Sequence, residues 1–301
     1  MKRAARLVLA GLLAACNLIG HDNSQQAATP SHYNRGLLYA QQGQTDDAIS
    51  EFSAAVRDNP RDAQAYHNLA LMLEKSGNLN GAITEFQGAL AINPDSEPTH
   101  LLLADAYARR GDLDLAAAQY QAALRLGPND PRAHNNYGLL LRRRGDLTGA
   151  IKQYQSARSL SPDDFAARVN LGIALYEAGD LSGAARELNY AISLHTNNPL
   201  PRDVLGFVLF EMNHVDDALL QWQTAANLDP GSADIAAAMA IGLWRKGNKP
   251  DSLTIYRQAI SLNRAYVCSD KALQTEGYWN AAAVDVLHDV REFAGAAVCR
   301  S

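Results

Sequence analysis

The stretch AQAYHNLALMLEKSGNLNGAITEFQGALAINP, residues 63–94, decides the fold that we expect for the whole chain. Around Leu69 its apolar residues recur at spacings of three and four, which places them on one face of a helix. Gly77 ends this helix because glycine adopts left-handed backbone geometry without a Cβ penalty. Asn80 is the expected cap of a second helix, which ends before Pro94. Each helix has one apolar face, so the pair needs neighbours that bury both faces.

The same pattern recurs with a period of 34 residues, and we number positions 1–34 within each repeat with Ala63 at position 1. Position 15 is Asn213 in one repeat and glycine in the others: Gly43, Gly77, Gly111, Gly145, Gly179 and Gly247. Position 20 is small: Ala48, Ala82, Ala116, Ala150, Ala184, Ala218 and Ser252. Position 24 is large and apolar: Phe52, Phe86, Tyr120, Tyr154, Leu188, Trp222 and Tyr256. Seven repeats fit without an insertion.

This period and these residues resemble the tetratricopeptide repeat family over roughly four fifths of the chain. The resemblance implies an all-α fold, a right-handed α-solenoid of seven helix-turn-helix repeats with a C-terminal capping helix. A chain of 301 residues would otherwise suggest two domains, but a solenoid grows by stacking and has no such limit. The expected repeats are residues 29–62, 63–96, 97–130, 131–164, 165–198, 199–232 and 233–266.

Residues 267–301 leave the repeat pattern, but their apolar residues keep helical spacing from Trp279 to Phe293. A terminal repeat exposes an apolar face, so we expect one amphipathic helix to cover it in this capping segment. Cys268 and Cys299 lie at either end of the segment. In an exported protein such an isolated pair suggests a disulfide, and two buried unpaired thiols are the alternative.

Residues 1–15 have the layout of an export signal, with a basic head, a short apolar run and small residues before Cys16. The apolar run is too short to span a bilayer. The sequence Leu-Ala-Ala-Cys that ends at Cys16 resembles the lipobox of bacterial lipoproteins, in which this cysteine is acylated. An ordinary signal peptide with an incidental cysteine is the alternative.

Residues 16–28 then form a lipidated N-terminus followed by a polar tether. Asn17 follows the cysteine where an aspartate would favour the inner membrane, so the resemblance points to the outer membrane. We therefore expect a protein of the bacterial cell envelope, anchored by lipid to the periplasmic face of that membrane.

The family resemblance also implies where a ligand would bind. In the family the first helix of each repeat lines a concave face, and positions 2, 5, 6, 9, 12 and 13 point into it. Position 6 is asparagine in four repeats: Asn34, Asn68, Asn136 and Asn170. A carboxamide both donates and accepts hydrogen bonds, so this row is suited to the backbone of an extended peptide. Solvated asparagines without a ligand are the alternative.

Two further groups lie at or near position 12 of the same face. Arg109 and Arg142, with neighbouring arginines, have the planar fork that binds carboxylates of an acidic side chain or a C-terminus. Tyr176, Phe210 and Trp244 would form apolar sockets for a ligand. The alternatives are arginines that balance local acids and aromatic side chains packed between helices.

Several classes of function are disfavoured. Net charge is −5, and −8 once residues 1–15 are removed, which argues against nucleic-acid binding. Position 4 carries His32, His100 and His134, but equivalent residues of stacked repeats lie too far apart to share a zinc ion. Phosphate loops and serine-nucleophile motifs are missing from the sequence. We expect no cofactor, no metal, no small-molecule substrate and no enzymatic activity.

The expected function is a membrane-anchored scaffold or adaptor lipoprotein that binds protein or peptide partners in its concave groove and assists assembly of an envelope complex. The alternatives are a pilotin-like factor for pilus or secretin assembly, an adaptor for peptidoglycan enzymes, a structural spacer without a ligand, and an enzyme subunit.

Overall fold

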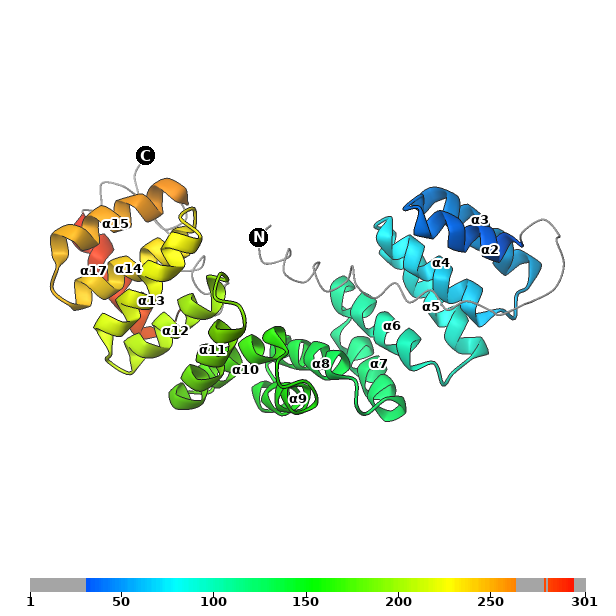
Figure 1. The fold of residues 1–301 in the computed structure, drawn as a ribbon, viewed down its shortest axis with the longest axis horizontal. Helices are drawn as coiled ribbons and strands as arrows, with labels where there is room; N and C mark the ends of the chain where they lie inside the picture. Colours follow the sequence, from blue (N-terminus) through cyan, green and yellow to red (C-terminus); the bar gives the residue numbers. More distant parts are fainter. Residues whose placement is uncertain (1–30, 264–278, 280, 295–301) are drawn as a thin grey trace. The chain divides into compact units, whose positions relative to one another are not determined.

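The computed structural model describes residues 31–263, 279 and 281–294. The expectations for Cys16, Cys268 and Cys299 lie outside these residues. Within the described residues every regular element is an α-helix, and fifteen helices are present. The expected all-α fold of paired helices followed by a capping helix is thereby confirmed (Figure 1).

Each repeat contributes a first and a second helix. The first helices are α2 (His32–Gln41), α4 (Ala63–Lys75), α6 (Glu97–Arg110), α8 (Pro131–Arg143), α10 (Phe165–Glu177), α12 (Leu200–Glu211) and α14 (Ala233–Arg245). The second helices are α3 (Thr45–Asp58), α5 (Leu79–Ile92), α7 (Leu113–Leu126), α9 (Leu147–Leu160), α11 (Leu181–Leu194), α13 (Val215–Leu228) and α15 (Lys249–Leu262). The capping helix is α17 (Ala281–Ala294).

The turn between the two helices of a repeat depends on position 15. Gly145 has a φ of 83°, and Asn213 at the equivalent position has a φ of 62°. The next N–H, that of Asp146, donates to the carbonyl of Leu141 at 2.9 Å and closes the first helix. Left-handed geometry is therefore required at this position in every repeat.

The second helices begin two residues earlier than the sequence suggested. The side chain of Asn78, at position 16, accepts a hydrogen bond from the N–H of Gly81 at 3.0 Å and caps α5. The expectation that Asn80 is the cap is wrong because α5 starts directly after the glycine turn. Asp146 and Asp180 cap α9 and α11 in the same way.

The two helices of a repeat pack closely through small residues. In the sixth repeat Gly206 faces Trp222, and a Cβ on this glycine would lie 2.3 Å from the indole nitrogen. That nitrogen donates to the carbonyl of Asp203 at 3.1 Å. Trp222 is completely buried, as are Phe52, Phe86 and Tyr154 at the same position of other repeats. The core of each repeat is therefore one large side chain held against an alanine or glycine of the first helix.

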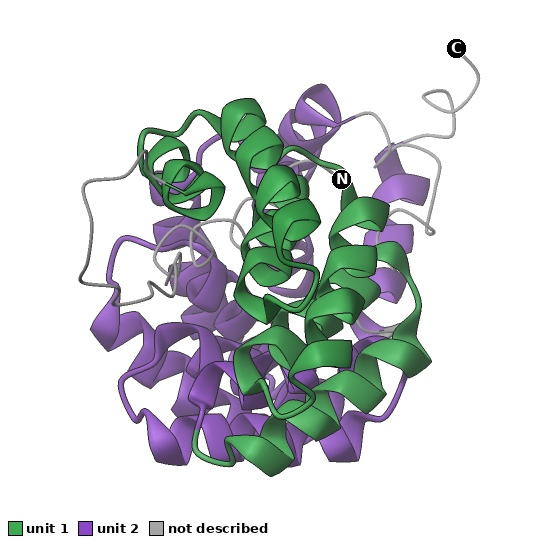
Figure 2. Ribbon diagram, turned by 90° about the vertical axis from the view of Figure 1, so that its right-hand side faces the viewer, with its two compact units in different colours: residues 1–129 green, residues 130–301 purple. Residues whose placement is uncertain are grey.

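The chain divides into two compact units, residues 1–129 and residues 130–301 (Figure 2). The described part of the first unit contains α2–α7, and that of the second contains α8–α15 with α17. In the second unit α17 packs against α14 and α15, as expected of a cap. Its residues Ala283, Leu287 and Val290 are buried, and Trp279, which precedes it, meets Phe207 edge to face at 5.1 Å. Among the described helices none combines the length and apolar character needed to cross a bilayer.

Candidate ligand-binding surface

The asparagines at position 6 of the first unit differ in their surroundings. Asn68 is completely buried between α2 and α4, and its Nδ2 donates to the Tyr33 hydroxyl at 3.0 Å. Its Oδ1 has no hydrogen-bond partner among the described residues. Asn34 is exposed on α2. The Asn34 carboxamide is therefore accessible to a ligand. Asn68 instead stabilises the contact between the first two repeats through its hydrogen bond to Tyr33.

In the second unit three carboxamides form a connected group on α8 and α10. Asn170 Nδ2 donates to Asn135 Oδ1 at 2.8 Å, and Asn135 Nδ2 approaches Asn136 Oδ1 at 3.4 Å. Asn136 and Asn170 are both half-buried, so part of each remains accessible. Here the structure brings together two of the asparagines that the sequence singled out and adds Asn135, a position-5 residue that the sequence reasoning did not use.

The expected arginine forks already hold carboxylates of their own chain. Arg109 forms an ion pair with Glu74 of the preceding repeat. Arg142 forms one with Glu177 of the following repeat, and the distance from its Nε to Oε2 is 2.8 Å. Each pair joins position 12 of one repeat to position 13 of the next. The arrangement supports the alternative that these arginines balance local acids.

The aromatic residues at position 12 belong to the same series of contacts. Phe210 lies under the guanidinium of Arg245, whose Cζ is 4.8 Å from the ring centroid. Burial raises the pKa of the Tyr176 hydroxyl, and its hydrogen bond to Glu211 raises it further. We call these contacts between positions 12 and 13 of successive repeats the rungs.

The expectation of open aromatic sockets is wrong for two of the three residues. Tyr176 and Phe210 are only 6% and 3% exposed, because they pack between first helices. Trp244 is half-buried. It contacts Phe293 of α17 edge to face at 5.3 Å, so the capping helix covers this position-12 residue.

The histidines at position 4 have polar partners at position 23, on the second helix of the same repeat. The Nδ1 atoms of His100 and His134 lie 2.7 Å from Oε1 of Gln119 and Gln153. His32 Nδ1 lies 2.7 Å from Glu51 Oε2. No group of three or more metal-ligating side chains occurs in the described part of the chain. The signal for these pairs was the Glu or Gln at position 23, which the sequence reasoning missed.

His67, at position 5, is buried beside the ring of Phe86, and its Nδ1 lies 2.9 Å from Thr99 Oγ1. Burial lowers the pKa of His67 to about 4. The ring is therefore neutral at physiological pH, and it contributes to the contact between α4 and α6 rather than to a site for anions.

An apolar groove of about 460 Å³ lies between α13, α14 and α15. It is lined by Leu219, Leu220, Gln223, Met239, Leu243, Asp251, Thr254 and Ile255. Leu220 is the most exposed large apolar residue that the structure describes. The groove is formed by the first helix α14 together with the second helices α13 and α15, and none of the asparagines at position 6 lines it.

Helix pairs that recur every 34 residues, joined by left-handed turns and followed by a capping helix, define a helical-repeat protein. One family model described as tetratricopeptide repeat matches residues 33–97 and 101–164. A second model with the same description matches residues 141–202. The chain belongs to the tetratricopeptide repeat family.

Solved structures share this fold. A tetratricopeptide repeat protein from Parabacteroides merdae has a TM-score of 0.61 and 16% identity, with 85% of this chain and 97% of that chain covered. PilF of Pseudomonas aeruginosa has a TM-score of 0.59 and 24% identity, with 73% and 99% covered. YrrB, described as having an unusual peptide-binding site, has a TM-score of 0.54 and 21% identity, with 60% and 92% covered. No curated protein sequence matches the chain.

Proposed function

We propose that the protein is a non-catalytic scaffold that binds an extended segment of a protein partner along its first helices. The observation that carries this proposal is the group of half-buried carboxamides on α8 and α10, which includes Asn136 and Asn170. Carboxamides pair with peptide groups both as donors and as acceptors, so they hold an extended backbone without selecting its side chains. The peptide-binding site named for YrrB, a protein of the same fold, supports this reading.

The rungs refine the proposal. Because Arg142 pairs with Glu177, and Arg109 with Glu74, a ligand carboxylate would have to compete with a carboxylate of the chain itself. Backbone recognition by the asparagines therefore contributes more to affinity than the arginines do. Removing one hydrogen-bonding partner from a recognition site costs about 1–3 kcal/mol, roughly a tenfold to hundredfold loss of affinity.

A photo-crosslinking residue in place of Asn136 tests this site in the full chain. We expect crosslinks to a defined segment of a partner in the cell envelope, mapped by mass spectrometry. The matched control places the same residue at Asn80, an exposed asparagine of the second helix α5 in the first unit. The segment identified at position 136 should then bind Asn136→Ala at least tenfold more weakly than the native chain. Equal crosslinking at both sites would contradict the proposal.

We propose further that the protein is a lipoprotein of the bacterial envelope, carried by acylated Cys16. The support is the Leu-Ala-Ala-Cys sequence after a basic and apolar leader. Acyl chains on this residue anchor a protein stably only when more than one is present, as in bacterial lipoproteins. Intact mass of the membrane fraction should show a chain that starts at Cys16 with acyl mass. A different N-terminus, or membrane retention of Cys16→Ser, would refute the anchor.

A further inference from the structure

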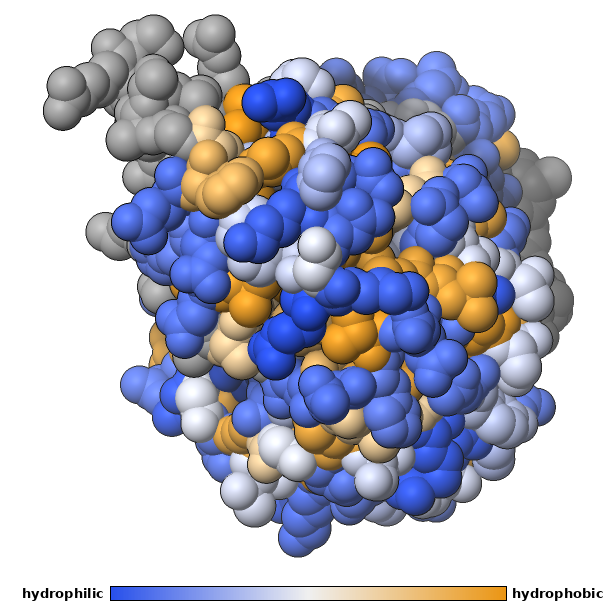
Figure 3. All heavy atoms as spheres, turned by 90° about the vertical axis from the view of Figure 1, so that its left-hand side faces the viewer, coloured by the Kyte–Doolittle hydropathy of each residue, from blue (hydrophilic) through white to orange (hydrophobic). Residues whose placement is uncertain are grey.

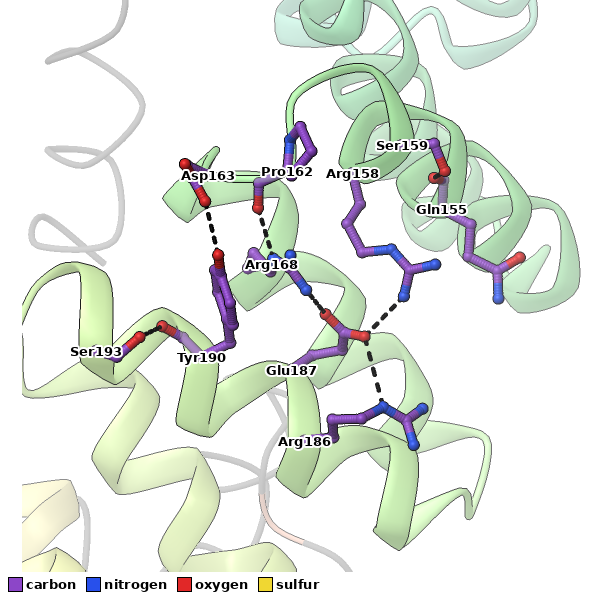
Figure 4. A network of polar contacts seen from close by, with 10 residues as sticks. All are labelled: Gln155, Arg158, Ser159, Pro162, Asp163, Arg168, Arg186, Glu187, Tyr190 and Ser193. Atoms are coloured by element: carbon purple, nitrogen blue, oxygen red, sulfur yellow. Dashed lines mark hydrogen bonds and ion pairs between the residues drawn. The ribbon is translucent and has the colours of Figure 1, made fainter.

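One carboxylate in the second unit is buried among arginines. Glu187 of α11 is 1% exposed, and its Oε1 accepts a hydrogen bond from Arg158 Nη1 of α9 at 2.7 Å. Its Oε2 accepts from Arg168 Nη1 of α10 at 2.6 Å (Figure 4). Arg186 Nε lies 3.9 Å from Oε1. Three guanidinium groups therefore converge on one negative charge, and positive charge remains in excess.

Arg158 is unusual among the repeats. Its position, 28, holds an aliphatic residue in the other six: Val56, Leu90, Leu124, Ile192, Ala226 and Ile260. A buried ion pair is often no more stable than the apolar contact that it replaces, because both charges lose their hydration. Stability alone therefore does not account for this arginine. Its side chain is 33% exposed, so it adds a cation to the surface of the second helices.

The neighbouring surface has the same sign of charge. Position 22 is Lys152 on α9 and Arg186 on α11, both exposed, and carries no cation elsewhere: Ser50, Thr84, Ala118, Leu220 and Thr254. Helix α9 contains no acidic residue, and the acid on α11 is the buried Glu187. This excess of cations lies on a chain whose net charge is −5.

A second set of contacts fixes the edge of this region. The Arg168 guanidinium lies 3.8 Å from the centroid of the Tyr190 ring, and its Nε donates to the Pro162 carbonyl at 2.8 Å. The Tyr190 hydroxyl donates to Asp163 at 2.7 Å (Figure 4). Asp163 is exposed and borders the cluster in the loop between α9 and α10, where its neighbour Asp164 caps α10. These contacts hold Arg168 in place, and Arg168 in turn fixes the Glu187 carboxylate that Arg158 binds, so the Arg158 side chain loses less entropy when it binds a ligand.

We propose that Lys152, Arg158 and Arg186, which we call the basic surface, form a docking site for an acidic segment of a protein partner. A guanidinium has five N–H donors, and Arg158 uses one of them on Glu187, so its remaining donors are available to a second carboxylate. The basic surface is on second helices, so it is a second docking site beside the carboxamides of the first helices. Membrane recognition by charge uses clusters of about four to eight basic residues, more than this surface offers.

The test measures binding of a fluorescent octaglutamate peptide to the full chain by anisotropy at low salt. Lys152 and Arg186 are both exposed, and the Arg186 side chain is 70% exposed, so the variant Lys152→Gln/Arg186→Gln should fold normally. We expect it to bind octaglutamate at least tenfold more weakly than the native chain. The control variant Arg125→Gln/Arg257→Gln removes the same charge from other exposed sites of second helices and should keep native affinity.

Three results would overturn the proposal: no octaglutamate binding by the native chain, an equal loss in both variants, or binding to phosphatidylglycerol vesicles without binding to the peptide. The second would indicate general charge attraction, and the third a lipid site. Asn136→Ala should bind octaglutamate with native affinity, which separates this docking site from the proposed peptide surface.

Discussion

At the scale of single residues, position 15 gives the clearest test of why glycine occupies the turns. Gly145 has a positive φ, and a Cβ added there would meet no atom within 4 Å. Any cost of Gly145→Ala therefore comes from backbone geometry alone. We expect a loss of about 1 kcal/mol in the free energy of unfolding. Urea denaturation followed by circular dichroism measures it.

The reciprocal change uses the one repeat without this glycine. Asn213→Gly relieves an asparagine held at a φ of 62°, so it should raise the free energy of unfolding by a few tenths of a kcal/mol. The prediction fails if Gly145→Ala leaves the free energy of unfolding unchanged and Asn213→Gly lowers it. That result would show that these turns are not left-handed in solution.

His67 should make the first unit sensitive to acid. Its folded-state pKa of about 4 lies below the ordinary histidine value of 6.5, so the unfolded chain takes up a proton between these pH values and the folded chain does not. The stabilisation is fully present above about pH 6.5 and is lost as the pH falls toward 4, on the order of 3 kcal/mol in total. Thermal unfolding between pH 7.5 and pH 4.5 measures the slope.

The control for this prediction is His214→Gln, because His214 is exposed at the start of α13. His67→Asn should flatten the dependence of unfolding on pH, whereas His214→Gln should leave it unchanged. Parallel slopes for His67→Asn and the native chain would assign the acid sensitivity to other groups.

The residue types at the turns and in the cores could be predicted from the sequence, because all seven repeats show which kind of residue occupies each position. It could not predict the partners of individual side chains. Asn68 has the residue type and position of a ligand contact, yet its amide donates to Tyr33 of the preceding repeat. That contact depends on how two helices stack, and no local pattern encodes it.

At the scale of helices, the rungs show that contacts between repeats use different chemistry at equivalent positions. The partly buried pair Arg142–Glu177 should have a measurable coupling energy, about 0.5–1 kcal/mol in a double-mutant cycle with alanine. The pair Lys246–Asp216 is a suitable control because both side chains are more than half exposed. We expect its coupling to be near zero. Equal couplings for the two pairs would mean that the rung contributes nothing beyond surface charge.

The rungs explain why Tyr176 and Phe210 do not form open sockets and why Arg142 is already paired with a carboxylate. Arginine, tyrosine and phenylalanine at position 12 have the composition of a binding surface, and position 12 considered on its own gives no sign of their orientation. Their partners at position 13 of the next repeat, such as Glu177 and Arg245, are 35 residues away. Pairing positions 12 and 13 of successive repeats indicates some of these contacts, such as Arg142 with Glu177, but it also aligns Ala108 with Arg143, which are not complementary.

At the scale of the whole molecule, stability should be local, since each repeat contacts mainly its neighbours. Phe293→Ala removes the ring that covers Trp244, so we expect faster amide hydrogen exchange in α14 and α15. Exchange in α2–α7 should stay at its native rate. Faster exchange throughout the chain would instead indicate one cooperative folding unit.

The predicted disulfide between Cys268 and Cys299 belongs to the same end of the chain and stays a prediction. It would close a loop of about thirty residues, for which chain-entropy estimates give roughly 3–4 kcal/mol. Thiol counting on denatured, unreduced protein decides it, and two free thiols at these residues would refute the pairing. If the disulfide forms, reduction should affect α17 and the last repeat before any other part.

The rungs also give the repeats an order that cannot be rearranged freely. Deleting residues 165–198 in frame would bring Arg142 opposite Glu211. This is again an arginine–glutamate pair, so the repeats on either side of the deletion would still have complementary charges at this contact. Deleting residues 165–232 would instead bring the half-buried Arg142 opposite Arg245, which has the same charge. The residue at position 13 of each repeat must therefore be compatible with the residue at position 12 of the repeat before it. This requirement limits which repeats the gene can duplicate or lose.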